Sequence, residues 1–251
     1  MHLNIAFISG ICCHFFGPML AQKRHFGGDD VTVDKFPFVV AISFVSELVG
    51  NGAIIAPRWI LSSASAFQVT PHSEYIAHAG GDVYKDGERY PSEAVYEHPE
   101  WNGYVANIAL MKLKWKLKFG AKVKPIKLFQ QDLDRVDDVF MISYGKNALG
   151  TKHLQGAPYF LTSDAACLAS LNTDYAKAIL QEGHGYCVND IGGNGARGQW
   201  HDDTGAPMVK DDRLVALWIL RDDEVITHHN NVSLATRVFF FGGWIESTMK
   251  F

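Results

Sequence analysis

Short apolar runs separated by turn-forming residues dominate the chain. The clearest runs cover residues 38–42, 53–55, 59–61, 108–111, 139–142 and 214–220. Clusters of Gly, Pro, Asn and Asp lie between them. This alternation of short strands and turns is typical of an all-β barrel or sandwich.

Two segments predict helices. Residues 163–171 begin with Ser-Asp, a helix-capping start, and continue into an Ala-rich run. Residues 242–251 predict a closing helix at the end of the sequence. The polar stretch 130–138 is the best internal boundary, and we find no repeat or low-complexity linker.

The first residues read as an export signal. Residues 1–17 are largely apolar and carry no Lys or Arg, and Lys23-Arg24 follow a few small residues later. We interpret residues 1–21 as a signal peptide and 22–24 as a short propeptide, although the signal lacks a basic start. A buried first strand or helix is the alternative. The apolar run is short for a membrane span, so we expect a secreted, extracellular protein and no membrane partner.

Composition fits a globular protein of 251 residues, with 47% hydrophobic and 20% charged residues. That length suits one large domain or two small ones that share a core. The net charge is −4, and removing residues 1–24 leaves 21 basic and 27 acidic residues, or −6. This balance gives no electrostatic argument for a nucleic-acid partner.

Four cysteines divide into two pairs. Cys12 and Cys13 lie in the predicted signal peptide, and Cys167 and Cys187 remain in the mature chain. An isolated pair in an exported protein predicts one disulfide, with two buried free thiols as the alternative. Two cysteines are too few for a zinc site, and we expect neither a metal nor a cofactor.

Eight short motifs follow one another along nearly the whole chain: FPFVV (36–40), WILSSASA (59–66), HPEWN (98–102), NIALMKL (107–113), VKPIKL (123–128), DTGAP (203–207), TRV (236–238) and WIES (244–247). In this order and spacing they resemble the trypsin and chymotrypsin family of serine proteases. The resemblance implies an all-β fold of two antiparallel six-stranded barrels with a C-terminal helix. The domain then covers 25–251, with the first barrel about 25–130, the second about 131–251, and the site between them.

The resemblance places Ser65, Asn107 and Thr204 at the family's catalytic His, Asp and Ser positions. In the family the His accepts the proton of the Ser nucleophile, and the Asp orients the His. A hydroxyl at position 65 offers no basic nitrogen near pH 7. Without a base, a Thr hydroxyl is a poor nucleophile. We therefore expect no catalysis.

Neighbouring positions of the family site are altered as well. Asp202 stands where the family has a Gly beside the oxyanion hole, and its carboxylate opposes the developing negative charge. Arg221 replaces a Gly that lines the primary pocket, and the pocket-floor acid corresponds to Gly198. His201 could in principle act as a replacement base, but its position matches the rim of the cleft.

The resemblance also accounts for features outside the triad. Arg24–His25 resembles the activation junction, and Asp203 matches the acid that pairs with the new α-amino group in active members; a simple loop cap is the alternative. Two family cysteines correspond to Gly50 and Ala66. The family also places a bridge at Cys167–Cys187.

Two surface features remain. Asn231-Val232-Ser233 is an N-glycosylation sequon, and His228-His229 read as loop residues. Seven lysines cluster after Asn107: Lys112, Lys114, Lys116, Lys118, Lys122, Lys124 and Lys127. If residues 112–118 form a strand, their alternate lysines make one basic ridge. That ridge is either a partner surface or a solvated edge protected by Lys.

We interpret the sequence as a secreted, catalytically inactive serine protease homologue that acts by binding proteins. It most resembles the inactivated protease paralogues of scabies mites, which are related to mite group 3 allergens. That resemblance implies binding of host defence proteins and inhibition of complement. The alternatives are an arthropod immune cofactor, which usually carries a clip domain longer than residues 1–24, and a residual hydrolase that uses Thr204.

Overall fold

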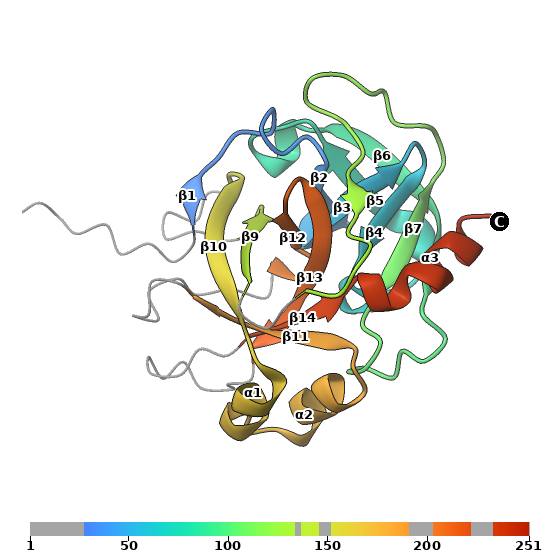
Figure 1. Cartoon of the computed structure of the whole chain (residues 1–251). Helices are drawn as coiled ribbons and strands as arrows, with labels where there is room; N and C mark the ends of the chain where they lie inside the picture. The colour runs from blue at the N-terminus through green and yellow to red at the C-terminus, as the bar shows by residue number, and fades with distance from the viewer. Residues whose placement is uncertain (1–27, 134–136, 146–151, 191–202, 222–232, 251) are drawn as a thin grey trace, which may run out of the picture.

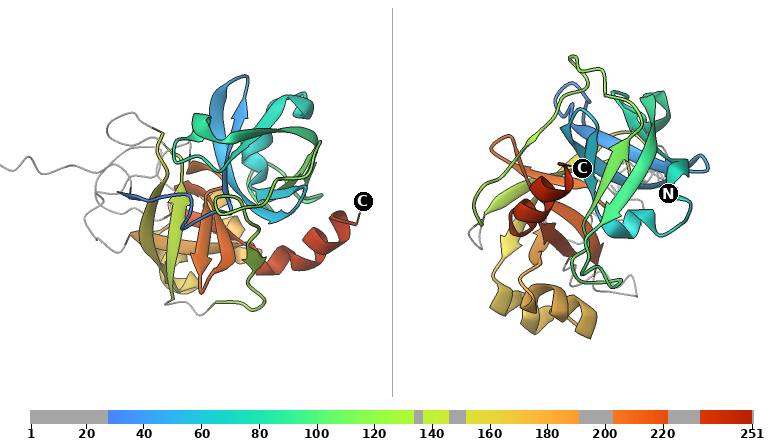
Figure 2. Two further views of the ribbon diagram at one scale, coloured as in Figure 1. Left: turned by 90° about the horizontal axis from the view of Figure 1, so that it is seen from above. Right: turned by 90° about the vertical axis from the view of Figure 1, so that its right-hand side faces the viewer.

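A computed structural model describes residues 28–133, 137–145, 152–190, 203–221 and 233–250, without the side chains of 190, 220 and 221. The strands form two closed six-stranded antiparallel barrels that lie side by side (Figure 1; Figure 2). This architecture confirms the predicted fold class.

The first barrel closes in the order β2-β3-β4-β7-β6-β5. Its strands are β2 (Val39–Phe44), β3 (Glu47–Ala56), β4 (Trp59–Ser62), β5 (Tyr75–Ala79), β6 (Glu88–Glu97) and β7 (Ala109–Leu113). Three 3₁₀ turns connect them, at Ala64–Phe67, His72–Glu74 and Tyr84–Asp86. Side chains that are fully buried fill the barrel, among them Val40, Ile54 and Met111.

The second barrel closes in the order β9-β10-β11-β14-β13-β12, because β9 pairs with both β10 and β12. Its strands are β9 (Asp138–Ser143), β10 (Gln155–Thr162), β11 (Gly185–Asp190), β12 (Pro207–Lys210), β13 (Arg213–Arg221) and β14 (Ser233–Arg237). Two short strands join this sheet: β1 (Asp29–Asp30) pairs with β10, and β8 (Lys127–Leu128) runs parallel to β13.

Three helices lie outside the barrels in the described ranges. Helices α1 (Asp164–Ser170) and α2 (Asp174–Gln181) lie together beside the second barrel (Figure 1). After a 3₁₀ turn at Phe239–Phe241, α3 (Gly242–Thr248) lies near the first barrel, where Trp244 contacts His98 at 5.1 Å between ring centroids. Helices α1 and α3 confirm the two predicted helices, and no helix in the described ranges is long and apolar enough to cross a membrane.

A separate apolar cluster joins the barrels. It contains fully buried residues of both halves, including Ala41 and Leu61 of the first barrel and Ile142 and Leu217 of the second. Burying aliphatic side chains between the two sheets fixes one barrel against the other.

Candidate functional site

The residues predicted at the triad positions come from three different segments at the junction of the barrels. Ser65 lies in the 3₁₀ turn after β4, Asn107 precedes β7, and Thr204 lies in the turn before β12. Asn107 is buried, whereas Ser65 and Thr204 are half-buried. The hydroxyl of Thr236 in β14 donates to the Asn107 carbonyl at 2.8 Å, which links this segment to the second barrel.

Ser65 and Asn107 bind each other through two hydrogen bonds. The backbone N–H of Ser65 donates to Asn107 Oδ1 at 2.9 Å, and Asn107 Nδ2 donates to Ser65 Oγ at 3.0 Å. Both polar atoms of the amide are thus used on the same residue. The Ser65 hydroxyl lies 3.4 Å from Ser63 Oγ, so it points back toward the start of the 3₁₀ turn.

Thr204 approaches the same region through its backbone. Its carbonyl accepts a hydrogen bond from the backbone N–H of Asn51 at 2.7 Å. Among the residues that the structure describes, the Thr204 hydroxyl makes no hydrogen bond. The geometry therefore gives this hydroxyl no described group that could remove its proton.

Gly50 and Ala66, where the resemblance places two family cysteines, lie close together. A Cβ built on Gly50 would be 3.0 Å from Ala66 Cβ and 2.8 Å from the Thr204 carbonyl oxygen. Cβ atoms of a disulfide are about 3.5–4.5 Å apart. The strand β3 and the turn that carries Ser65 have therefore closed tightly around two small residues.

Asn51 connects the barrels at this junction. Its side-chain Oδ1 accepts the Tyr144 backbone N–H at 2.8 Å, and its carbonyl accepts the Ser62 hydroxyl at 2.6 Å. Gly205 packs over this point with a φ of +74°, and a Cβ there would be 2.4 Å from the Asn51 carbonyl oxygen. Only Gly accommodates both that backbone conformation and that close approach.

Asp203 is buried with a hydroxyl partner. Ser143 Oγ donates to Asp203 Oδ1 at 2.6 Å, and the Gly145 backbone N–H donates to Ser143 Oγ at 2.9 Å. A Cβ on Gly145 would lie 1.8 Å from the same carboxylate oxygen. The carboxylate is therefore held against the loop after β9.

The sequence profile of the trypsin family matches residues 25–245. The chain belongs to the trypsin family. The bonded Ser65–Asn107 pair lies in two segments of the first barrel, and Thr204 lies in a segment of the second.

Relatives include both proteases and a protein named as inactive. The chain is 24% identical to serine protease SP24D of Anopheles gambiae over 93% of this chain and 84% of that protein. It is 34% identical to inactive CLIP domain-containing serine protease A8 of the same species, and 29% to rat complement C1s subcomponent, over 44% and 60% of this chain. The matches span only 34% and 24% of those two longer proteins.

Solved structures show the same fold. Neuropsin, a serine protease expressed in mouse brain, superposes with a TM-score of 0.74 over 88% of this chain and 98% of its own. The sequence identity is 18%, so the likeness concerns the fold.

Several predicted positions lie outside the described residues. They are the activation junction Arg24–His25, the pocket position Gly198, the rim residue His201, the oxyanion-site residue Asp202, the loop residues His228-His229 and the sequon Asn231. Arg221 ends β13, where its backbone pairs with Ser233, but its side chain is not described.

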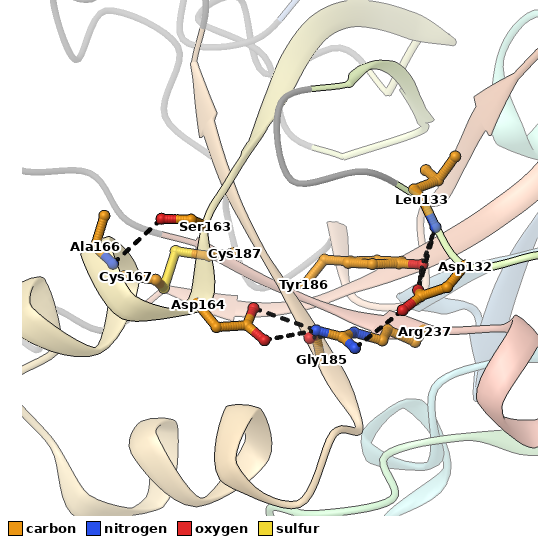
Figure 3. Close-up of polar contacts among 10 residues, drawn as sticks. All are labelled: Asp132, Leu133, Ser163, Asp164, Ala166, Cys167, Gly185, Tyr186, Cys187 and Arg237. Carbon is orange, nitrogen blue, oxygen red and sulfur yellow. Dashed lines mark hydrogen bonds and ion pairs between the residues drawn. A yellow bond between two sulfur atoms is a disulfide. The ribbon is translucent and has the colours of Figure 1, made fainter.

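The predicted disulfide is confirmed, and an ion network that the sequence did not reveal lies beside it (Figure 3). Cys167 in α1 is bonded to Cys187 in β11, with 6.1 Å between their Cα atoms.

Arg237 at the end of β14 is buried, and its Nη2 binds both carboxylate oxygens of Asp164 at 3.2 and 3.1 Å. Its guanidinium also lies 3.5 Å from Asp132 and 4.6 Å from the Tyr186 ring.

A Ser–His pair does exist in the chain, away from this site. Ser43 Oγ lies 2.8 Å from His78 Nε2 on the outer face of the first barrel, where the His78 ring contacts Tyr84, and both Ser43 and His78 are buried. Burial, with Arg89 and Lys85 nearby, lowers the pKa of His78 to about 4. Because the imidazole has no access to a substrate, this pair serves packing.

The prediction of a basic ridge on a strand was wrong. Strand β7 ends at Leu113, so Lys114, Lys116 and Lys118 follow it in a loop without strand pairing. Lys112 and Lys118 bind Glu93 and Glu88 at 3.3 and 2.8 Å. The other two lysines are exposed and have no acidic partner among the described residues.

Proposed function

We propose that this trypsin-family chain is a secreted, catalytically inactive homologue that acts by binding other proteins. The observation that carries the proposal is the pair of hydrogen bonds between Ser65 and Asn107. An amide and a hydroxyl face each other where the resemblance puts the base and its orienting carboxylate. Neither group accepts a proton near pH 7.

Covalent labelling tests the absence of catalysis. Purified protein is incubated with a fluorophosphonate probe, and a trypsin-family protease with an intact triad serves as the positive control. We expect no label and no turnover of a broad peptide library. Labelling at Thr204, or turnover that Thr204→Ala abolishes, would establish the rival function of a residual hydrolase.

Rebuilding the triad tests how far the site has diverged. Ser65→His, Asn107→Asp and Thr204→Ser together should give at most slow hydrolysis of small activated esters. Adding Asp202→Gly and Arg221→Gly should raise kcat/KM further, because placement of the substrate contributes roughly 7–11 kcal/mol. Efficient peptide turnover by the triple variant would contradict the assignment of Asp202 and Arg221 as obstructing residues.

Complement-type defence proteins are the partners we propose. The resemblance to inactivated mite paralogues supports this choice, and so does the similarity to complement C1s, because a homologue can compete for the partners of an active protease. Mature protein added to serum should reduce complement-dependent lysis. Unchanged lysis at saturating protein, with intact folding, would refute this partner class.

The loop after β7 is the contact surface we propose for such a partner. Lys114, Trp115 and Lys116 are exposed side by side, with the Trp side chain at 62% exposure. Lys114→Glu with Lys116→Glu should abolish binding of the partner in a pull-down. Ala at Ser65, Asn107 and Thr204 should leave it intact; the opposite pattern would place binding in the old cleft.

An immune cofactor is the second function that a specific observation favours. The chain is 34% identical to inactive CLIP domain-containing serine protease A8 over 44% of its length. A cofactor accelerates activation by an active protease, whereas an inhibitor slows it. Adding the protein to a reconstituted arthropod protease cascade distinguishes the two directly.

Export and processing are part of the same proposal. Cleavage after residue 21 removes the signal peptide, cleavage after Arg24 starts the chain at His25, and a glycan occupies Asn231. N-terminal sequencing and intact mass of the secreted protein test all three. A secreted chain that keeps residues 1–21 would contradict the signal peptide.

A further inference from the structure

A cavity of about 640 Å³ lies between the segment that connects the barrels and helix α3. It is separate from Ser65, Asn107 and Thr204, none of which lines it. Its size falls within the range of about 300–1,000 Å³ that holds small ligands. Nothing in the proposed protein-binding function uses this cavity.

The wall of the cavity is mainly apolar. Ile126, Val238 and Ile245 are buried and form part of it, and Leu128 is half-buried. Phe239 also lines it, yet its side chain remains 45% exposed. Apolar atoms that stay open to water in a concave site gain free energy when a ligand covers them.

Two cations lie together in this wall. Lys127 in β8 pairs directly with Arg213 in β13, so their side chains come from adjacent backbone positions. Both line the cavity, and neither has an acidic partner among the described residues. Of the described residues that line the cavity, Glu246 of α3 is the one acid, so the lining carries a net positive charge. Asp211 and Asp212 of the neighbouring hairpin do not line it.

We propose that this cavity binds an amphipathic monocarboxylate of the fatty-acid class. The alkyl chain covers Phe239 and the aliphatic wall, and the carboxylate binds Arg213 and Lys127. Arg presents a planar fork of donors that matches a carboxylate, and Lys adds a point charge. This inference does not depend on the proposed protein-binding function.

Calorimetric titration with laurate tests the proposal on the mature protein. We expect saturable binding at one site, at least about tenfold tighter than for 1-dodecanol, because only laurate carries the charge. Dodecyltrimethylammonium, with the same tail and the opposite charge, should not bind. Equal binding of all three compounds, or no saturable heat with laurate, overturns the proposal.

Matched variants locate the site. Lys127→Gln with Arg213→Gln should weaken laurate binding about tenfold or more, whereas Lys114→Gln with Lys116→Gln, outside the cavity, should not change it. Phe239→Ser should also weaken binding, compared with Phe160→Ser on β10, another exposed Phe. If the double variant fails to fold by near-UV circular dichroism, the Phe239 comparison decides. Unchanged affinity in a folded cavity variant overturns the assignment.

Discussion

The two barrels have the same number of strands but are stabilised by different interactions. The second barrel carries the Cys167–Cys187 disulfide and the buried Arg237 network beside it (Figure 3). At the positions where the resemblance places a family bridge, Gly50 and Ala66 of the first barrel lie close together. The first barrel therefore relies on close van der Waals packing at this point, whereas the second barrel has a covalent link.

The two barrels also differ in the helices that lie on their outer surfaces. Helices α1 and α2 lie outside the second barrel and bury few large side chains, so a covalent and ionic clamp compensates for a small core. Both barrels have a continuous apolar interior. The first barrel carries no α-helix between residues 39 and 113, and its stability depends on packing, where errors of a few tenths of an ångström matter.

The largest effect is expected from removing the disulfide. Cys167→Ala with Cys187→Ala should lower the free energy of unfolding by roughly 3 kcal/mol, since the bridge closes a loop of 20 residues. Urea unfolding measures the loss. Hydrogen exchange should increase in α1, β10 and β11 and stay unchanged in β2 to β7. Equal increases in both barrels would contradict the comparison.

The Arg237 network should contribute somewhat less. Arg237→Met keeps the side-chain volume but leaves Asp132 and Asp164 without their cation, which we expect to cost about 2 kcal/mol. The value is below that of a fully buried pair, because these carboxylates are 47% and 31% exposed. Urea unfolding again measures it. Lys118→Met, which removes an exposed pair with Glu88, is the control and should leave the midpoint unchanged.

Close packing in the first barrel should be sensitive to one methyl group. Gly50→Ala should cost about 1–2 kcal/mol, because the new Cβ meets backbone at Thr204 and Ala66 Cβ within 3.0 Å. Gly120→Ala is the matched control, since a Cβ there has no neighbour within 4 Å. Thermal unfolding of the two variants should separate them; equal midpoints would show that this junction relaxes freely.

Strands with apolar runs were predictable, and strands without them were not. The runs at 38–42 and 139–142 became β2 and β9. Strand β6 escaped detection because Glu88–Glu97 contains Pro91 and mixed charges, and its pairing with β5 and β7 comes from distant segments. Helix α2 carried a detectable signal, Thr173-Asp174 before apolar residues at helical spacing, but it is only eight residues long.

The order of the motifs predicted which residues belong to the candidate site, but not how these residues contact one another. Motifs indicated Ser65, Asn107 and Thr204 separately. The hydrogen bonds between Ser65 and Asn107, however, join segments 42 residues apart in the chain. The contact between Gly50 and Ala66 likewise requires the closed barrel. The alternating lysines favoured a strand that continues to residue 118, whereas β7 ends at Leu113. A period-two pattern does not by itself supply a neighbouring strand to pair with.

The smallest effect near neutral pH is expected from His78 in the first barrel. Burial lowers the pKa of His78 to about 4 in the folded protein, whereas an unfolded His titrates near 6.5. Between these values the unfolded chain binds a proton that the folded chain refuses. Stability should therefore be complete above about pH 6.5 and fall as the pH drops toward 4.

His98 and His184 contribute in the same direction, since burial also lowers the pKa of each. Urea midpoints measured from pH 7 to pH 4 should fall less steeply in His78→Gln than in the parent protein. Ser43→Ala removes the hydroxyl beside His78 without removing the titrating group, so it should lower stability at pH 7 and keep the parent slope. Parallel curves for His78→Gln and the parent would show that acid sensitivity arises elsewhere. Protonation of His78 would then destabilise the first barrel no more than it destabilises the second.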